Sequence, residues 1–115
     1  MSHFENDATG GVFAKNSMVM VTLNQPREKY WGAILGITPA GVSLRGIDLN
    51  SFEDFMRQVI SGDEVFPNFV FFPMHRVERI ELDHRSGDIP SMQERFQNKT
   101  GKSFRDHFLA AEAGR

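Results

Sequence analysis

The sequence predicts a small, mainly β domain. We expect five short, strongly bent strands that close into a barrel, one helix inserted between the third and fourth strands, and a short helical C-terminal tail. Five short segments rich in apolar residues have the pattern of strands, whereas one segment follows the helical period. Glycines interrupt the second and third of these strands, as the bending of a small barrel requires. We expect a flexible N-terminal arm over residues 1–16, the barrel over 17–82 and the tail over 83–115.

Composition limits the class of protein. The 115 residues are 40% hydrophobic and 24% charged, which is typical of one globular domain. No apolar run approaches the roughly 20 residues of a bilayer-spanning helix, and residues 1–11 lack the pattern of a secretory signal, so we expect a cytoplasmic protein. The absence of cysteine excludes disulfides and zinc–thiolate sites. The net charge of −2 does not favour a nucleic-acid partner.

The first two predicted strands cover residues 17–24 and 29–37. Both alternate between apolar and other residues, and a proline-containing turn separates them. In the second strand Trp31 lies on the apolar face, whereas Gly32 and Gly36 share the opposite face. Two glycines on one face indicate bending or a close approach of another backbone segment.

A tight turn precedes the third predicted strand, over residues 42–49. Its apolar positions change parity between Leu44 and Ile47, with Gly46 between them. Because side chains alternate across a strand, this change predicts a bulge at Gly46.

Residues 50–61 form the clearest helix. Their apolar side chains recur at the spacing of one helical face, and Gly62 is placed to end the helix. The pattern predicts an amphipathic helix that covers the barrel. The apolar stripe consists of Phe52, Phe55, Met56, Val59 and Ile60.

The fourth predicted strand, over residues 65–72, is the most aromatic. Its apolar residues occupy both faces, which indicates a strand that is covered on two sides. The last strand covers residues 76–82, and its change of phase predicts an irregular turn around His75 and Arg76. The aromatic residues of the fourth strand are Phe66, Phe69, Phe71 and Phe72.

The tail after residue 83 carries two helix starts. Ser91 with Glu94 caps a helix that ends near Gly101, and Ser103 begins a second possible helix. Helices this short are not stable alone in water. We therefore expect the tail to pack on the barrel or on a neighbouring subunit, through Phe96, Phe104 and Phe108.

Residues 17–82 resemble the Sm-like (LSm) small barrels, which have an SH3-like topology and include the bacterial RNA chaperone Hfq. The resemblance rests on the strand order and on the sequences of residues 19–23, 31–37, 41–46 and 71–80. It implies a ring-like homo-oligomer in which the fourth strand of one subunit pairs with the fifth strand of the next. Such pairing hides two sheet edges.

The chain departs from the Sm pattern at the RNA-binding positions. Sm proteins carry an acidic residue and an asparagine in the turn after the second strand, whereas residues 38–41 offer neither. The Lys-His pair of the chaperone corresponds to Met74-His75, so only the histidine matches.

Three polar residues near the last strand are the first candidate ligand- or RNA-binding group. His75, Arg76 and Arg79 together offer donors to a phosphate or carboxylate around a pore. The alternative is structural: His75 bonds to a nearby carbonyl group, and the arginines form ion pairs.

Two further candidates lie in the second and third strands. Trp31 is suited to stacking on a base, although a single tryptophan at a strand start is also typical of core packing. Arg45 precedes Gly46 and so resembles the Arg-Gly pair of Sm-type sites, but it lies on the third strand and not in the later loop.

Neither a metal site nor a catalytic site is predicted. Asp83, His84 and His107 lack the regular spacing of metal ligands. The sequence contains no nucleophile elbow, glycine-rich phosphate loop or paired-carboxylate motif, so we expect no cofactor and no enzymatic activity.

Three functions follow from these patterns. The first is a non-enzymatic, self-assembling Sm-like barrel that acts as a scaffold or binding module. The second is an RNA-binding ring of the Sm/Hfq type. The third, a small enzyme with a site between subunits, has no supporting motif.

Overall fold

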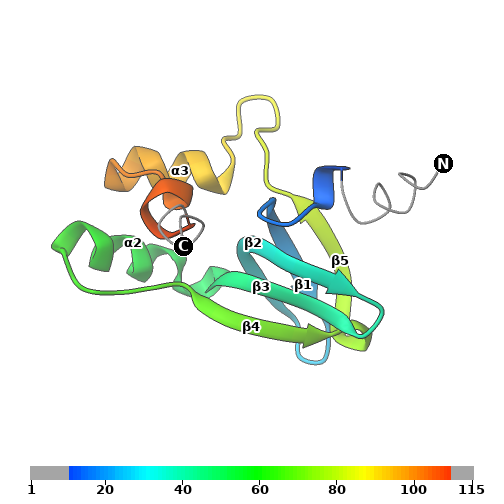
Figure 1. The fold of residues 1–115 in the computed structure, drawn as a ribbon. Coiled ribbons are helices and arrows are strands. Elements are labelled where there is room, and N and C mark those ends of the chain that lie inside the picture. The colour runs from blue at the N-terminus through cyan, green and yellow to red at the C-terminus, as the bar shows by residue number, and fades with distance from the viewer. Residues whose placement is uncertain (1–10, 110–115) are drawn as a thin grey trace.

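The computed structural model describes residues 11–109 (Figure 1). Five antiparallel strands form one curved sheet in the order β4-β3-β2-β1-β5. In the described chain β4 and β5 both remain edge strands, so the sheet is not closed and the predicted barrel closure is not observed. The strands are β1 (Met18–Leu23), β2 (Glu28–Thr38), β3 (Gly41–Asp48), β4 (Asn68–Pro73) and β5 (Val77–Leu82).

Two glycines allow the backbones of β2 and β3 to approach closely. Gly32 pairs with Gly46 across the two strands. A Cβ atom on Gly32 would lie 2.3 Å from the carbonyl oxygen of Arg45, and one on Gly46 would lie 2.2 Å from that of Trp31. The close approach expected at Gly32 is therefore confirmed. Gly36, by contrast, faces open space.

The bulge predicted at Gly46 is wrong. The register between β2 and β3 shifts on the β2 side instead, between Ile34 and Gly36. The apolar parity of β3 changes because both of its faces are buried, with Leu44 and Ile47 in different apolar clusters. A strand covered on two sides imitates a bulge in the sequence pattern.

Each face of the sheet has its own hydrophobic cluster. We call the cluster made by the strands alone the sheet core; it contains Val19, Val21, Leu23, Ile34, Leu44 and Phe72. We call the second cluster, which the helices cover, the helix core. It contains Met18, Trp31, Ala33, Ile47, Phe52, Phe55, Met56, Val59, Phe96, Phe104, Phe108 and Leu109.

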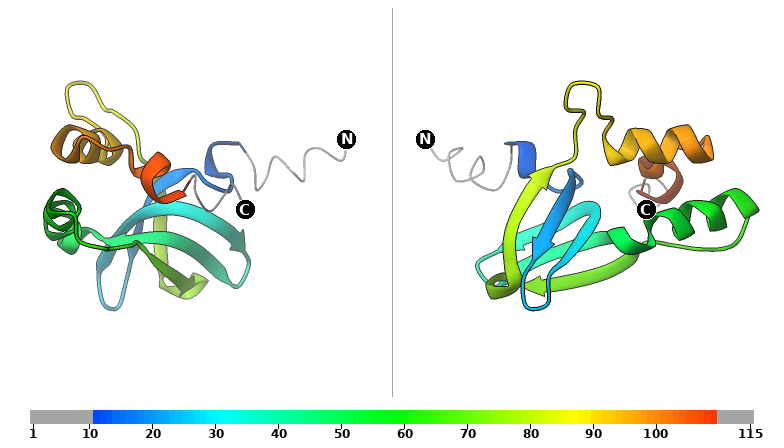
Figure 2. Two further views of the ribbon diagram at one scale, coloured as in Figure 1. Left: turned by 60° about the vertical axis from the view of Figure 1, so that its left-hand side comes forward. Right: turned by 180° about the vertical axis from the view of Figure 1, so that it is seen from behind.

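The helices gather over one end of the sheet (Figure 2). The predicted inserted helix is present as η2 (Leu49–Ser51) followed by α2 (Phe52–Ser61), and Gly62 ends it with a φ of 83°. Its apolar stripe is buried except for Ile60, which is 53% exposed. The tail forms α3 (Met92–Thr100) and the short π-helical segment η4 (Arg105–Leu109).

The phenylalanines of the tail pack within the same chain. Phe104 lies 4.4 Å from Trp31 between ring centroids, and Phe108 lies 5.4 Å from Phe55. Phe96 is fully buried beside them. Of the two packing partners expected for the tail, the structure therefore places it on the body of its own subunit.

Two other expected features are resolved. The irregular turn before the last strand is present as the 3-10 helix η3 (Met74–Arg76). Residues 1–10 of the expected arm lie outside the described residues, whereas residues 11–13 form the 3-10 helix η1. Phe13 packs against the sheet core, and the backbone N–H of Asn16 donates to Ile34. In the described part of the chain, no helix has the length and apolarity needed to cross a bilayer.

Candidate functional site

Exposed phenylalanines line the edge strand β4. Phe69 and Phe71 are 65% and 52% exposed, whereas Phe72, between them and the end of the strand, is buried in the sheet core. The expectation that this strand is covered on both faces is therefore wrong, because only one face is covered. Phe66, just before the strand, is 66% exposed. We call Phe66, Phe69 and Phe71 the aromatic edge.

Buried neighbours support the rings of the aromatic edge. The guanidinium group of Arg45 lies 4.3 Å from the ring centroid of Phe69, and its Nε donates to the Pro67 carbonyl at 3.2 Å. Arg45 is only 4% exposed, so it acts as a fixed platform. Phe71 covers Gly41, where a Cβ atom would lie 2.6 Å from the phenylalanine ring. The sheet therefore holds both exposed rings in place.

The inner face of β4 anchors the strand. Phe72 meets Tyr30 edge-on, with 4.9 Å between ring centroids. Burial raises the pKa of the Tyr30 hydroxyl, and the nearby Asp48 and Glu28 carboxylates raise it further. The phenol is therefore neutral at physiological pH, and Tyr30 acts as a packing residue.

The opposite edge strand, β5, has a different character. Its exposed side chains are charged: Arg79 pairs with Glu81 at 3.3 Å, and Glu78 pairs with Arg27 at 3.7 Å. The register between β1 and β5 shifts close to Glu78. Charges and bulges are the usual protection of an edge strand against pairing with other chains.

Arg76 is engaged in holding a turn. Its Nε donates to the carbonyl of Asn24 at 2.9 Å, and its Nη2 donates to the carbonyl of Pro26 at 2.7 Å. It also pairs with Glu28 at 3.2 Å. Arg76 therefore fastens the β1–β2 turn to the start of β5, as the structural interpretation of this residue expects.

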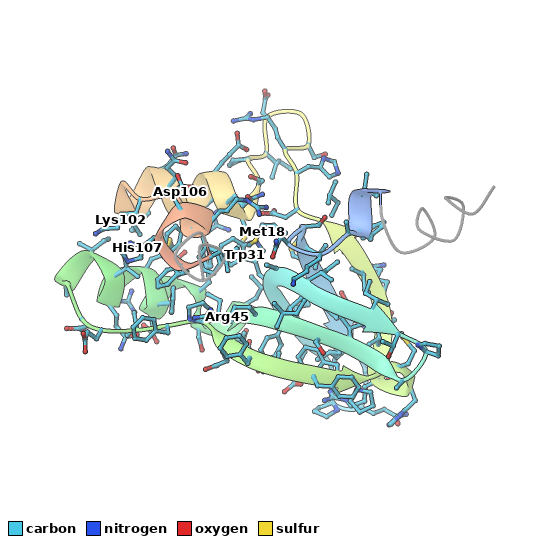
Figure 3. The ribbon with its side chains drawn as sticks, in the orientation of Figure 1. Met18, Trp31, Arg45, Lys102, Asp106 and His107 are labelled. Atoms are coloured by element: carbon cyan, nitrogen blue, oxygen red, sulfur yellow. The ribbon has the colours of Figure 1, made fainter. Side chains whose placement is uncertain are left out.

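The structure separates the five sequence-predicted candidates into two groups. His75 and Arg76 belong to η3 and Arg79 to β5, the next element along the chain, and His75 is exposed. Trp31 and Arg45 lie on neighbouring strands at the helix-covered face (Figure 3). Trp31 is completely buried, so its ring faces are occupied by protein and not open to a base.

Asp83 fixes Trp31 and the tail together. Its carboxylate accepts the indole N–H of Trp31 at 3.0 Å and the backbone N–H groups of Met92 and Gln93 at 2.8 and 3.0 Å. The last two donors belong to the first turn of α3, where backbone N–H groups lack helical partners. From the sequence, Asp83 is a candidate only for metal binding. Its role in bonding the indole is not visible there, because Trp31 lies 52 residues away in the chain.

The residues that were weighed as metal ligands do not converge. Asp83 is committed to the three donors above, and His84 Nδ1 lies 2.8 Å from the Arg85 carbonyl. His107 packs on Phe108 in η4. Between residues 11 and 109, no group of three or more metal-binding side chains is close enough to hold an ion.

A shallow hollow of about 280 Å³ lies between α2 and α3. Arg95 spans it, pairing with Glu53 at 3.2 Å and lying 5.4 Å from the Phe52 ring. These contacts join the two helices across the hollow, so its polar groups already serve packing. The lining residues are Glu53, Met56, Arg95, Asn98 and Lys99.

Comparison with known proteins found no matching family model, no matching curated protein and no matching solved structure.

Proposed function

We propose that the chain is a non-enzymatic, self-assembling β-domain of the Sm-like type that acts as a scaffold or binding module. The observation that carries this proposal is the aromatic edge along β4, whose outer side pairs with no strand of the described chain. The strand order and the helix inserted between β3 and β4 support the Sm-like interpretation. In this proposal, subunits assemble through a sheet edge that one chain leaves open.

The physical argument for assembly is the cost of leaving this edge uncovered. A strand edge presents unpaired N–H and C=O groups that template pairing with another strand. Beside them, Phe66, Phe69 and Phe71 each expose more than half of their surface. Burial of such rings by a partner removes apolar area from water and stabilises the complex.

The polar side chains support a structural role over a catalytic one. Arg76 holds a turn, Asp83 holds the tail, and Arg95 joins α2 to α3. Each of these groups is used by contacts within the fold. We therefore propose that the chain functions through its aromatic edge.

The second candidate function is RNA binding. It is favoured by His75 and Arg79, which lie exposed near the same end of β5. The engagement of Arg76 with the β1–β2 turn and the pairing of Arg79 with Glu81 reduce the positive charge available to a phosphate. We therefore rank RNA binding below assembly.

Light scattering coupled to size-exclusion chromatography tests the assembly. We expect the wild-type chain to form oligomers as its concentration rises, and the double variant Phe69→Lys/Phe71→Lys to be a monomer. Two new charges on an edge strand oppose its pairing. The control Ile89→Lys changes a residue that is 69% exposed in a loop and should assemble like the wild type.

Two results would contradict the proposal: a wild-type monomer at every concentration, or unchanged assembly of the double lysine variant. Titration of the same samples with single-stranded RNA separates the second candidate. Salt-sensitive binding that is lost in Arg79→Ala would favour the RNA-binding function.

A further inference from the structure

We infer that the partner of β4 is the β4 strand of a second copy, which lies antiparallel to it across a two-fold axis at Val70. This inference rests on the proposed function and names the partner of the same edge. It differs from the ring that the Sm-like resemblance implies, where β4 meets β5 of the next subunit.

The difference between the two edges carries the first step. β5 presents Glu78, Arg79 and Glu81 and has a register shift, whereas β4 has the uncharged sequence NFVFFP. Pairing β4 with β5 would place charged groups against Phe69 and Phe71. The charged groups would then lose part of their hydration, which is unfavourable. A second β4 is the edge of this chain that matches β4 in both charge and apolarity.

The second step is the self-complementarity of β4. Residues that face each other across an antiparallel pair point to the same side of the sheet. A two-fold axis at Val70 therefore places Phe69 opposite Phe71 of the second copy, and Phe71 opposite its Phe69. The four rings then form one cluster on the outer face of a continuous sheet. Such aromatic cross-strand pairs are among the stabilising ones.

The third step fixes the register. Centring on Val70 pairs residues 68–72 with one another and leaves Pro73 outside the ladder. Proline has no N–H to donate, so it belongs at the end of a paired segment. Centring on Phe71 instead would bring Pro73 into the ladder. Arg45 and Gly41 hold the two exposed rings before the partner arrives, which lowers the entropic cost of binding.

The area involved predicts a modest affinity. A strand of six residues with two exposed rings, together with Phe66 just before it, contributes an interface at the lower end of the specific size range. We therefore expect a dissociation constant of about micromolar order. Isologous pairing uses the same surface on both copies, so assembly through this edge ends at a dimer.

Single-cysteine crosslinking tests the two-fold axis directly, because the chain contains no cysteine. The axis places residue 70 next to its own copy, so we expect Val70→Cys to give a covalent dimer under mild oxidation or with a short bis-thiol reagent. Ile80→Cys on β5 is the matched control, since both residues border the sheet core. Ile80→Cys alone should stay uncrosslinked. Circular dichroism of each reduced variant verifies the fold.

Charge complementation gives a second readout that does not need cysteine. In the proposed register, Phe69→Lys/Phe71→Lys places lysine opposite lysine, and Phe69→Glu/Phe71→Glu places glutamate opposite glutamate. Each variant alone should dimerise at least about tenfold more weakly, because like charges face each other. An equimolar mixture should recover a dimer, since every lysine then faces a glutamate.

The outcomes separate the two proposals. A wild-type monomer overturns both. In a third outcome, the chain forms oligomers, but Val70→Cys gives no crosslink and the double variant Val70→Cys/Ile80→Cys gives a ladder of crosslinked species. This result overturns the two-fold pairing, whereas the proposed assembly function remains. Failure of the mixed charge variants to dimerise also overturns the two-fold pairing. A crosslinked dimer together with recovery in the mixture supports it.

Discussion

Asp83 is the residue that joins the sheet, the core and the tail. One buried carboxylate accepts hydrogen bonds from the Trp31 indole and from two backbone N–H groups at the start of α3. Hydrogen bonds to a charged acceptor are stronger than neutral ones. The carboxylate also lies at the positive end of the helix dipole, which favours a negative charge there.

Replacing Asp83 by alanine tests this role. The Asp83→Ala variant leaves three donors without their acceptor, so we expect the free energy of unfolding to fall by about 3 kcal/mol. Urea unfolding followed by circular dichroism measures the loss, and the fluorescence of Trp31, the only tryptophan, follows the indole site. Asp88→Ala, at an exposed position of the next loop, is the control and should cost little. An equal effect of both variants would show that the hydrogen bonds of Asp83 contribute no stability.

At the scale of the element, the close pairing of β2 with β3 requires two positions without a side chain. Gly32 and Gly46 face each other where the backbones approach, and any Cβ atom would meet a carbonyl oxygen. Backbone atoms cannot move aside as a flexible side chain can. The two glycines are therefore requirements of the sheet geometry.

The two glycines of β2 provide a matched pair for a test. Gly32→Ala puts a methyl group 2.3 Å from the Arg45 carbonyl oxygen, so we expect a loss of about 3 kcal/mol or more, or failure to fold. Gly36→Ala, in the same strand, adds the same methyl group in open space and should be tolerated. Thermal unfolding of both variants measures the contrast. A Gly32→Ala variant as stable as wild type would refute the close approach.

The capping box of α3 gives stability a dependence on pH. The Ser91 backbone N–H donates to the Glu94 carboxylate at 2.7 Å. This hydrogen bond lowers the pKa of Glu94 below its ordinary value of 4.5. Partial burial opposes the shift, and Arg85 adds to it. Because the folded pKa is the lower one, this contribution is present above pH 4.5 and is lost as the pH falls through the folded pKa.

The Glu94→Gln variant tests that dependence. Denaturant midpoints of wild type and variant should differ most near neutral pH, and the difference should shrink as the pH falls below 4.5. The direction follows from the lowered pKa, because protonation then favours the unfolded chain. A difference that stays constant between pH 7 and pH 3 would contradict this role of Glu94.

At the scale of the whole molecule, local patterns predicted the elements and failed where distant segments meet. The five strands, the inserted helix and the Ser91–Glu94 cap all follow from neighbouring residues. The exposed face of β4 was misjudged because alternation shows which residues are apolar, not whether a second layer reaches them. The hydrogen bond from Trp31 to Asp83 links residues that are 52 positions apart in the chain and leaves no trace in local periodicity.

For the candidate site too, the sequence shows the residue types but not their three-dimensional setting. The aromatic content of the fourth strand was visible in the sequence, yet its exposure depends on how far α2 and α3 extend over the sheet (Figure 2). The platform under Phe69 depends on Arg45, its register partner on the neighbouring strand β3. Pairing of this kind is set by strand register, which composition does not encode.

The two cores also impose an order on biosynthesis. The sheet core draws on residues made before position 83, whereas the helix core needs Phe96, Phe104 and Phe108 from the far end of the described chain. A nascent chain emerging from the ribosome therefore completes one side of its sheet while Trp31 on the other side still awaits its cover. Until those phenylalanines pack on the sheet, Trp31 stays uncovered, and a chaperone has an apolar surface to bind.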